Sequence, residues 1–168
     1  MLMTDDIYEH IRFESQDNPN PVAIEPELKS RTLVINGVSK TYAMTGWRIG
    51  WAAGPADLIA ALDMLQSQSV SNACSISQAA TLAALKGDQS FVAEWANIYR
   101  QRRDRALEMI NAIPGLSCRK PGGAFYLYVN CFGMIGRTTP EGKKLETDMD
   151  VVMYLLEGVG VAVIAGTV

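Results

Sequence analysis

One lysine and one arginine near the middle of the sequence have surroundings that favour chemistry over a structural role. Lys40 lies in the segment 36–51 with a hydroxyl residue on each side. A β-branched apolar run, 32–35, precedes this segment, and a second apolar run, 49–53, begins directly after Arg48. A lysine in a loop between two expected strands, with an arginine opening the second, is unusual for stability alone. We interpret Lys40 as carrying an aldehyde cofactor as a Schiff base, and Arg48 as holding that cofactor's phosphate.

This chemistry sets conditions that the stretch can meet. An amine attacks an aldehyde only when it is unprotonated, and a free lysine is almost wholly protonated at neutral pH. Burial and a neighbouring positive charge both favour the neutral amine, and apolar runs and Arg48 offer these to Lys40. A guanidinium binds phosphate with a fixed two-pronged fork. The plainer alternatives are a surface lysine in a polar loop and an arginine in a structural ion pair.

Two adjacent carboxylates, Asp5 and Asp6, stand toward the end of an expected apolar strand over 1–8. Buried carboxylates need a partner, which makes their position informative. The residues alone do not choose between the two aspartates. His10, the single histidine, is interpreted as a bystander.

Composition excludes several function classes. The chain has 168 residues, of which 48% are hydrophobic and 20% charged, as in a globular protein. A net charge of −3 gives no electrostatic argument for nucleic acid. No apolar run approaches the roughly 20 residues that cross a bilayer, and no secretory signal pattern opens the chain, so no membrane partner is expected.

The cysteines predict neither disulfides nor a metal site. There are three, Cys74, Cys118 and Cys131, and they form no paired motif. Reduced cysteines and a cytoplasmic location are therefore the expectation. With one histidine and no cysteines at ligand spacing, no metal site is predicted.

Hydrophobic periodicity predicts the first elements. We expect short buried strands over 1–8, 33–35 and 49–53, the last two of parallel type, and a loop over 15–26. Helical spacing begins at Pro55 and continues to Leu65. A polar loop is expected over 67–72. A second helix is expected over 77–85, ended by Gly87.

A long helix and a shorter α+β segment follow. Apolar residues from Phe91 to Ile113 fall on one stripe, and the arginines between them are interpreted as a solvated face because acidic residues lie alongside. Later expectations are strands at 116–119 and 124–129, a helix over 147–157 capped by Thr147 or Asp148 and stopped at Gly158, and a strand at 161–164.

This order predicts an α/β fold: the second part of a larger domain, followed by a smaller α+β domain. We place the division inside the long helix, giving residues 1–96 and 97–168. The chain begins and ends in the middle of a pattern, so it is expected to be a piece of a longer protein.

Several motifs resemble one family. The segment 39–50, SKTYAMTGWRIG, resembles the lysine signature of class I aminotransferases, enzymes of the aspartate aminotransferase fold that use pyridoxal 5'-phosphate. The stretches 5–10, 121–126 and 160–166 resemble the family's preceding strand end, its small-domain strand and the start of its final segment. The resemblance covers the whole chain and implies a fragment of the large domain followed by most of the small one.

The resemblance also assigns roles. Lys40 would be the catalytic Schiff-base lysine, whose released amine shuttles a proton between substrate and cofactor. Arg48 would hold the phosphate. The family's Asp-x-x-Tyr pattern picks Asp5 for the ring nitrogen, and Tyr8 would then bond the ring oxygen. Ser39 is a further candidate for the phosphate, although some relatives carry that serine three positions before the lysine, where this chain has a glycine.

The implied reaction is amino-group transfer between an amino acid, first aspartate, and a 2-oxo acid, 2-oxoglutarate. The resemblance implies a homodimer whose sites borrow residues from the second subunit. The family's phosphate-cupping turn, an asparagine and a carboxylate-binding arginine have no counterpart here, and Ala165 stands where relatives usually carry proline. We therefore expect this chain alone to be inactive. Alternatives are a lyase on the same fold, a cofactor-sensing domain of a transcription regulator, and a fragment that binds no cofactor.

Overall fold

The computed structural model describes residues 1–14 and 20–167. They form two compact units. Unit 1 comprises Met1–Arg100 with Gly122–Phe125, and unit 2 comprises Gln101–Pro121 with Tyr126–Val168. The expected domain division at residue 97 concerns the family's two domains and stays a prediction.

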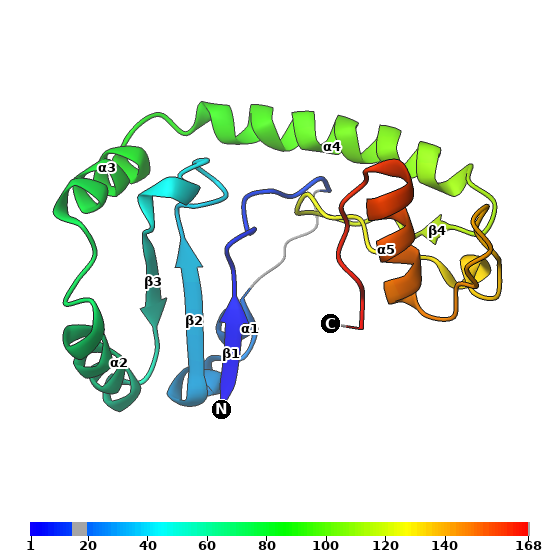
Figure 1. Ribbon diagram of the computed structural model, residues 1–168. Helices are drawn as coiled ribbons and strands as arrows, with labels where there is room; N and C mark the ends of the chain where they lie inside the picture. The colour runs from blue at the N-terminus through cyan, green and yellow to red at the C-terminus, as the bar shows by residue number, and fades with distance from the viewer. Residues whose placement is uncertain (15–19, 168) are drawn as a thin grey trace. The chain divides into compact units, whose positions relative to one another are not determined.

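A three-stranded sheet organises unit 1. Its spatial order follows the chain (Figure 1), with strands β1 (Leu2–Asp5), β2 (Thr32–Gly37) and β3 (Gly50–Ala53). β1 and β2 are parallel, with Asp5 opposite Ile35. β2 and β3 are antiparallel, with Gly37 opposite Gly50.

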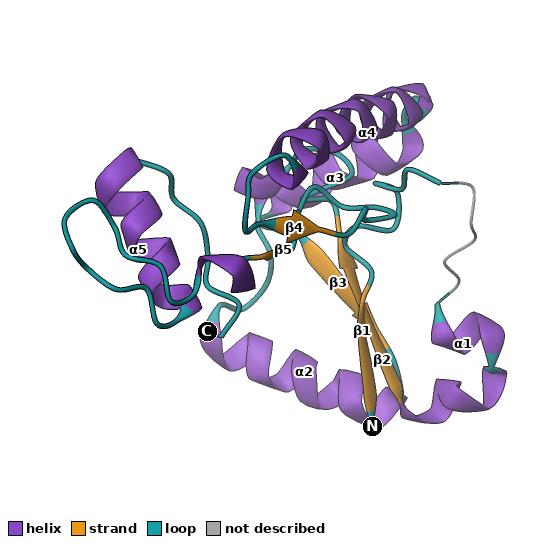
Figure 2. Ribbon diagram, turned by 90° about the vertical axis from the view of Figure 1, so that its right-hand side faces the viewer, coloured by secondary structure: helices purple, strands orange, loops and turns teal. Residues whose placement is uncertain are grey.

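The expectation of a parallel strand at 49–53 is therefore wrong. The connection 38–49 contains only a short 3-10 helix, η2 (Thr45–Trp47). Parallel neighbours need a long crossover, usually a helix, whereas this connection turns the chain straight back. The longer connection from β1 to β2 carries α1 (Pro21–Ile24) and the 3-10 helix η1 (Pro26–Arg31), and there the strands are parallel (Figure 2).

Burial in the outer strands also differs from the expectation. β1 is mostly exposed and all four residues of β3 are exposed, including Trp51. An apolar run indicates that a face can be covered, but it does not show that the described residues cover it. β1 also ends earlier than predicted, because the Asp5 side chain accepts a hydrogen bond from the Ile7 amide and starts a turn.

The expected loop over 15–26 is partly helical. Asn20 caps α1 by accepting a bond from the Val22 amide, and Pro21 occupies the first helical position, where its missing N–H is harmless. Residues 15–19 of that expected loop lie outside the described residues.

Two helices follow β3, α2 (Ala56–Ser69) and α3 (Ser75–Lys86). α3 is confirmed, with Gly87 as its C-cap. α2 runs into the polar stretch expected as a loop. Ser67 and Ser69 donate their hydroxyls to backbone carbonyls one turn earlier, which lets polar residues remain helical.

The long helix is confirmed as α4 (Ser90–Asn111), which contributes residues to both units. Unit 2 continues with a small antiparallel pair, β4 (Ser117–Cys118) and β5 (Val129–Asn130), then the 3-10 helix η3 (Phe132–Met134) and α5 (Asp148–Val159). The cap of α5 is Thr147, in a reciprocal capping box with Asp150.

Three expectations in unit 2 are wrong. The strand expected at 124–129 shrinks to its last position, and residues 161–164 form no strand, with Ile164 almost fully exposed. Alternating apolar residues form a strand only where a neighbouring strand provides hydrogen-bond partners for the backbone. α5 passes the predicted stop at Gly158 and ends at Gly160, whose φ of 71° suits the left-handed cap.

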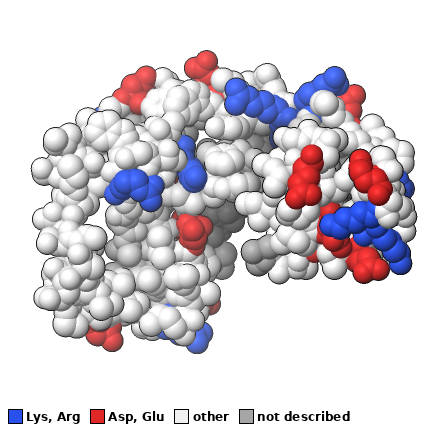
Figure 3. All heavy atoms as spheres, viewed as in Figure 1, with Lys and Arg blue, Asp and Glu red and all other residues white. Residues whose placement is uncertain are grey.

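Few of the described apolar side chains are buried in either unit. The buried apolar side chains are Ile11, Val38 and Ile49 in unit 1, and Leu145, Val151 and Ala165 in unit 2. Many other apolar residues are exposed, and α2 and α3 present few charged side chains on the face shown in Figure 3. Among the described helices, none combines the length and apolar character needed to cross a membrane.

Candidate active site

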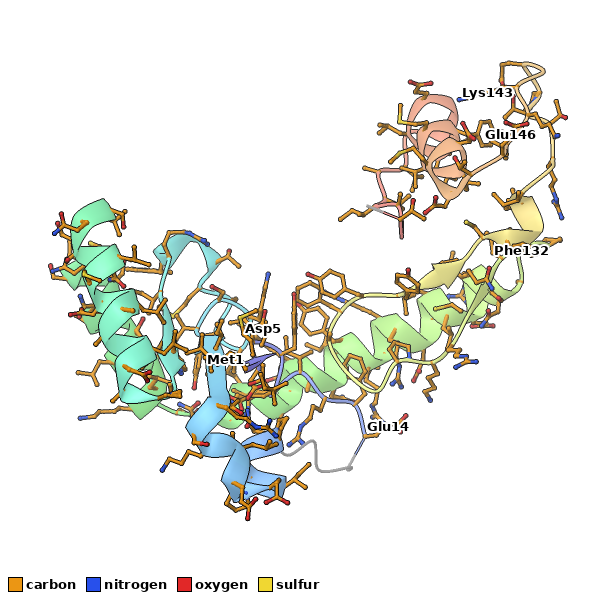
Figure 4. All side chains as sticks on the ribbon, turned by 90° about the horizontal axis from the view of Figure 1, so that it is seen from below. Met1, Asp5, Glu14, Phe132, Lys143 and Glu146 are labelled. Atoms are coloured by element: carbon orange, nitrogen blue, oxygen red, sulfur yellow. The ribbon has the colours of Figure 1, made fainter. Side chains whose placement is uncertain are left out.

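Strand directions bring the predicted site residues to one edge of the sheet. β1 and β2 are parallel, so their carboxyl ends share an edge, and antiparallel β3 begins at that edge. Asp5 ends β1, as Figure 4 shows, while Lys40 follows β2 and Arg48 immediately precedes β3. Two residues far apart in sequence, Asp5 and Lys40, therefore reach the same edge through the parallel pairing alone.

Two buried residues anchor the loop that carries Lys40. Val38 is fully buried and Thr41 is 5% exposed, so the residues around the lysine fix the loop to the unit. The amide of Tyr42 bonds the Val38 carbonyl at 3.2 Å, and that of Ala43 bonds the Lys40 carbonyl at 3.3 Å. These bonds make a tight turn that leaves Lys40 half-buried.

Aromatic rings surround the lysine amine. Lys40 Nζ lies 5.8 Å from the centroid of the Tyr8 ring and 5.4 Å from that of Phe125. The two rings meet edge to face, with centroids 5.2 Å apart and planes at 82°. The structure thus brings Lys40 and Tyr8 together. Phe125 was not among the predicted site residues. The stretch 121–126 was noted only for its family resemblance, which was the available signal.

Backbone hydrogen bonds between segments 11–13 and 122–124 hold Phe125 near the Lys40 amine. The Phe13 amide bonds the Gly122 carbonyl at 2.9 Å, and the Ala124 amide bonds the Ile11 carbonyl at 2.8 Å. Gly123 sits so close that an added Cβ would lie 2.7 Å from the Ile11 carbonyl oxygen. Only glycine permits this approach.

The two adjacent aspartates have different surroundings. Asn20 Nδ2 donates to Asp6 Oδ2 at 2.6 Å and to Thr4 Oγ1 at 3.1 Å, so these two side chains share one face of the strand. Asp5 projects from the opposite face and accepts a bond from the Ile7 amide at 3.2 Å. A carboxylate has about four acceptor sites, so Asp5 keeps capacity for a ring nitrogen. Each carboxylate accepts one of these hydrogen bonds, so the choice of Asp5 over Asp6 stays a prediction.

Arg48 adopts a left-handed backbone conformation, with φ 55° and ψ 48°. Its Nη1 donates to the Thr45 carbonyl at 2.8 Å, which uses one of five guanidinium N–H groups. Ser39 lies half-buried beside Lys40. Arg48 and Ser39 thus share the sheet edge by position.

A polar bridge joins the two segments that carry Tyr8 and Lys40. Asn36, toward the end of β2, donates a hydrogen bond from its side-chain Nδ2 to Glu9 Oε1 at 2.6 Å. The side-chain Oδ1 of Asn36 accepts a hydrogen bond from the Gly37 amide at 2.7 Å. Glu9 follows Tyr8 directly. The bridge therefore sets the spacing between the two segments, a role that the sequence did not predict.

Unit 1 also has an apolar hollow of about 360 Å³, lined by Tyr42, Met44, Ala83, Ala84, Gly87, Asp88, Phe91 and Trp95. The Tyr42 hydroxyl donates to Gln89 Oε1 at 2.8 Å, and its ring packs against Phe91. These contacts give Tyr42 a structural role.

Together the edge offers four kinds of group: an amine, a carboxylate, a phenol and a guanidinium. They suit, in turn, an aldehyde, a pyridine nitrogen, a ring hydroxyl and a phosphate. The donor set therefore fits a phosphorylated pyridine aldehyde.

Comparison with known proteins agrees with this chemistry. The family model for aminotransferase class I and II matches residues 1–168. An aspartate aminotransferase of Rhizobium meliloti (strain 1021) is 51% identical over 166 residues, 99% of this chain and 40% of that protein. A probable aspartate/prephenate aminotransferase of Rhizobium leguminosarum bv. phaseoli is 52% identical, over 42% of its length.

Solved structures give the same result. The crystal structure of the Rhizobium meliloti aspartate aminotransferase matches 99% of this chain with a TM-score of 0.93 and 51% identity, using 42% of its own chain. An aspartate aminotransferase variant from Thermus thermophilus gives 0.82 at 38% identity. The expected α/β fold is confirmed, and the chain spans about two-fifths of the length of these relatives. This chain therefore belongs to the class I and II aminotransferase family.

Proposed function

We propose that this chain supplies the lysine side of the cofactor site of an aminotransferase. Its family uses pyridoxal 5'-phosphate. The observation that carries the proposal is the position of Lys40: its amine lies at the sheet edge where β1 ends and β3 begins. No other lysine of the chain stands in a matching motif.

Each residue at the edge has a task in this proposal. Lys40 Nζ attaches the cofactor covalently and, once released, moves a proton to or from the substrate's α-carbon. Asp5 holds the pyridine nitrogen, the Tyr8 hydroxyl bonds the ring oxygen, and Arg48 binds the phosphate, with Ser39 as a secondary phosphate donor. The bound cofactor supplies an electron sink for the negative charge that develops at that carbon.

The substrates follow from the family and from the relatives' names. We propose an amino acid, aspartate first, as donor and a 2-oxo acid, 2-oxoglutarate, as acceptor. The name of the Rhizobium leguminosarum relative adds prephenate as a second oxo acid to test. We further propose a cytoplasmic homodimer for the complete enzyme.

The isolated 168-residue chain is proposed to be inactive, because it matches only 40% of the length of its relative from Rhizobium meliloti. A spectrophotometric assay with pyridoxal 5'-phosphate, aspartate and 2-oxoglutarate tests this. Turnover above that of the free cofactor would contradict it.

The role of Lys40 has a separate test. The chain is incubated with limiting pyridoxal 5'-phosphate, reduced with borohydride and mapped by mass spectrometry. We expect the label on Lys40 in preference to the other lysines, and Lys40→Ala should abolish the selective fraction. Lys29→Ala is the matched control, because Lys29 is exposed on η1. Labelling spread evenly over all lysines would overturn the assignment.

A further inference from the structure

The amine of Lys40 faces two aromatic rings that belong to different segments of unit 1. Its Nζ lies within 6 Å of both the Tyr8 and the Phe125 centroids, at 5.8 Å and 5.4 Å. That distance is the range in which an ammonium is attracted by the negative face of a ring. The two ring faces therefore attract the Lys40 side chain when it carries its ammonium charge.

The second ring is itself held in place from its far side. Tyr99, on α4, stacks on Phe125 with centroids 5.6 Å apart and planes tilted by 31°. Tyr8 meets it edge to face at 5.2 Å. Phe125 therefore has aromatic neighbours on two sides and an ammonium near its face. A ring braced in this way loses little entropy when it binds a cation.

We propose that Tyr8 and Phe125 form a receiving site for the Lys40 ammonium, which the lysine occupies whenever its amine is not bonded to the cofactor. Phe125 is the positioning residue of this site. The proposal rests on the proposed function of Lys40. It adds a position for the Lys40 side chain between its two proposed roles, attachment of the cofactor and transfer of a proton.

The receiving site has a physical consequence. A released lysine with four rotatable methylene links would otherwise point into water, away from the substrate's α-carbon. Two ring faces keep the ammonium beside the sheet edge, so its proton stays within reach. The same contacts must break before the amine can react elsewhere.

The direct test follows the position of the ammonium. The lysines of the chain are reductively methylated with ¹³C-formaldehyde, which keeps their positive charge, and the Lys40 signal is assigned with Lys40→Arg. Ring currents should move the Lys40 N-methyl resonance upfield of that of exposed Lys29. A Lys40 resonance that coincides with those of exposed lysines in the unaltered protein would overturn the proposal, whatever the variants do.

Variants then identify the ring responsible. Phe125→Leu keeps an apolar side chain of similar bulk but has no ring, so the upfield shift should shrink, whereas Phe125→Tyr should retain it. With trinitrobenzenesulfonate at one fixed neutral pH, Lys40 in Phe125→Leu should react about two- to fivefold faster, the size of a partly exposed cation–π contact. Unchanged shift and reactivity in a folded Phe125→Leu chain would show that Phe125 plays no such part.

The failure of this proposal is distinguishable from failure of the proposed function. If the ring-current shift is present but Lys40 is not the residue labelled by pyridoxal 5'-phosphate, only the function of Lys40 fails. If Lys40 is labelled selectively but shows no ring-current shift, only the receiving site fails.

Discussion

The two units adopt left-handed backbone conformations with different residue types. Among the described residues, non-glycine positions with positive φ all lie in unit 1: Ala43, Arg48, Ser71 and Ala124. The glycines with positive φ all lie in unit 2: Gly115, Gly136, Gly142 and Gly160. A side chain in this region costs about 1–3 kcal/mol, whereas glycine enters it freely.

Three of these four positions in unit 1 belong to the segments of the candidate site, whereas Ser71 lies between α2 and α3. Ala43 follows the lysine turn, Arg48 is the proposed phosphate residue, and Ala124 immediately precedes Phe125. Unit 2 turns its chain without this cost. Among the described residues, non-glycine positions with this strain therefore occur only in the unit that holds the candidate site, where surrounding contacts can hold the backbone in place.

Carboxylates show a second contrast. In unit 2, Asp150 accepts bonds from the amides of Glu146 and Thr147 and from the Thr147 hydroxyl, and it also lies 3.4 Å from Lys143. Acidic and basic side chains are interspersed there (Figure 3), and Figure 4 labels Lys143 and Glu146 in the loop before α5. In unit 1, Asp5 has capacity left for a ligand. Asp150 of unit 2 thus has a structural role.

The largest expected effect tests whether the strained arginine is functional. Arg48→Lys keeps the charge and the backbone demand but loses the planar fork. We expect selective labelling of Lys40 by pyridoxal 5'-phosphate to need roughly ten- to hundredfold more cofactor, the value of a charge-assisted hydrogen bond. Arg119→Lys, on an exposed residue of unit 2, is the control. Equal labelling in the two variants would remove Arg48 from the site.

The next effect tests the close approach that delivers Phe125. In Gly123→Ala the new Cβ would meet the Ile11 carbonyl oxygen, so we expect a loss of about 1–3 kcal/mol in the free energy of unfolding. Gly122→Ala is a matched neighbour whose Cβ would meet nothing within 4 Å.

Tryptophan fluorescence during urea unfolding measures this loss, because all three tryptophans lie in unit 1. Similar midpoints for the two alanine variants would mean that the approach at Gly123 is relaxed in solution.

Reciprocal substitutions sharpen the backbone comparison. Ala43→Gly should stabilise unit 1 by about 0.5–1 kcal/mol, because it relieves a strained conformation at some cost in entropy. Gly142→Ala should destabilise unit 2 by about 1 kcal/mol, since its φ is 88° and its Cβ would meet no other atom.

Hydrogen exchange measured separately on peptides of each unit reads out both changes. A gain from Gly142→Ala, or a loss from Ala43→Gly, would contradict the assignment of strain.

The smallest effect concerns acid. Bonds from the Glu146 amide and the Thr147 side chain lower the pKa of Asp150, and the Thr167 hydroxyl lowers the pKa of Asp148. A lowered pKa in the folded state contributes stability above the ordinary aspartate value of about 3.9, and this is lost as pH falls through the folded value.

Protection of α5 amides, corrected for intrinsic exchange, should therefore fall below about pH 4. Asp150→Asn should reduce the loss of α5 amide protection at low pH. Asp57→Asn, at an exposed position of α2, should leave that loss unchanged. An identical pH profile for Asp150→Asn and the unaltered chain would contradict the prediction.

Sequence reasoning worked best where the signal is local. The apolar stripe from Phe91 predicted α4, and Thr147 was one of two predicted caps for α5, because both depend on residues within one or two helical turns. It failed at 161–164, where a strand was expected but no described strand pairs with these residues. A ladder needs a second strand, and local pattern carries no information about one.

Within the candidate site, the sequence predicted which residues carry chemistry. Lys40 and Arg48 belong to a long, position-specific motif, and Asp5 and Tyr8 match the family's Asp-x-x-Tyr pattern. Tertiary structure decided the rest: β3 pairs antiparallel, Asn20 donates a hydrogen bond to Asp6, and Phe125 lies near the lysine amine. Residue type and spacing are written along the chain, whereas strand direction and contacts between distant segments depend on how the connections between them close.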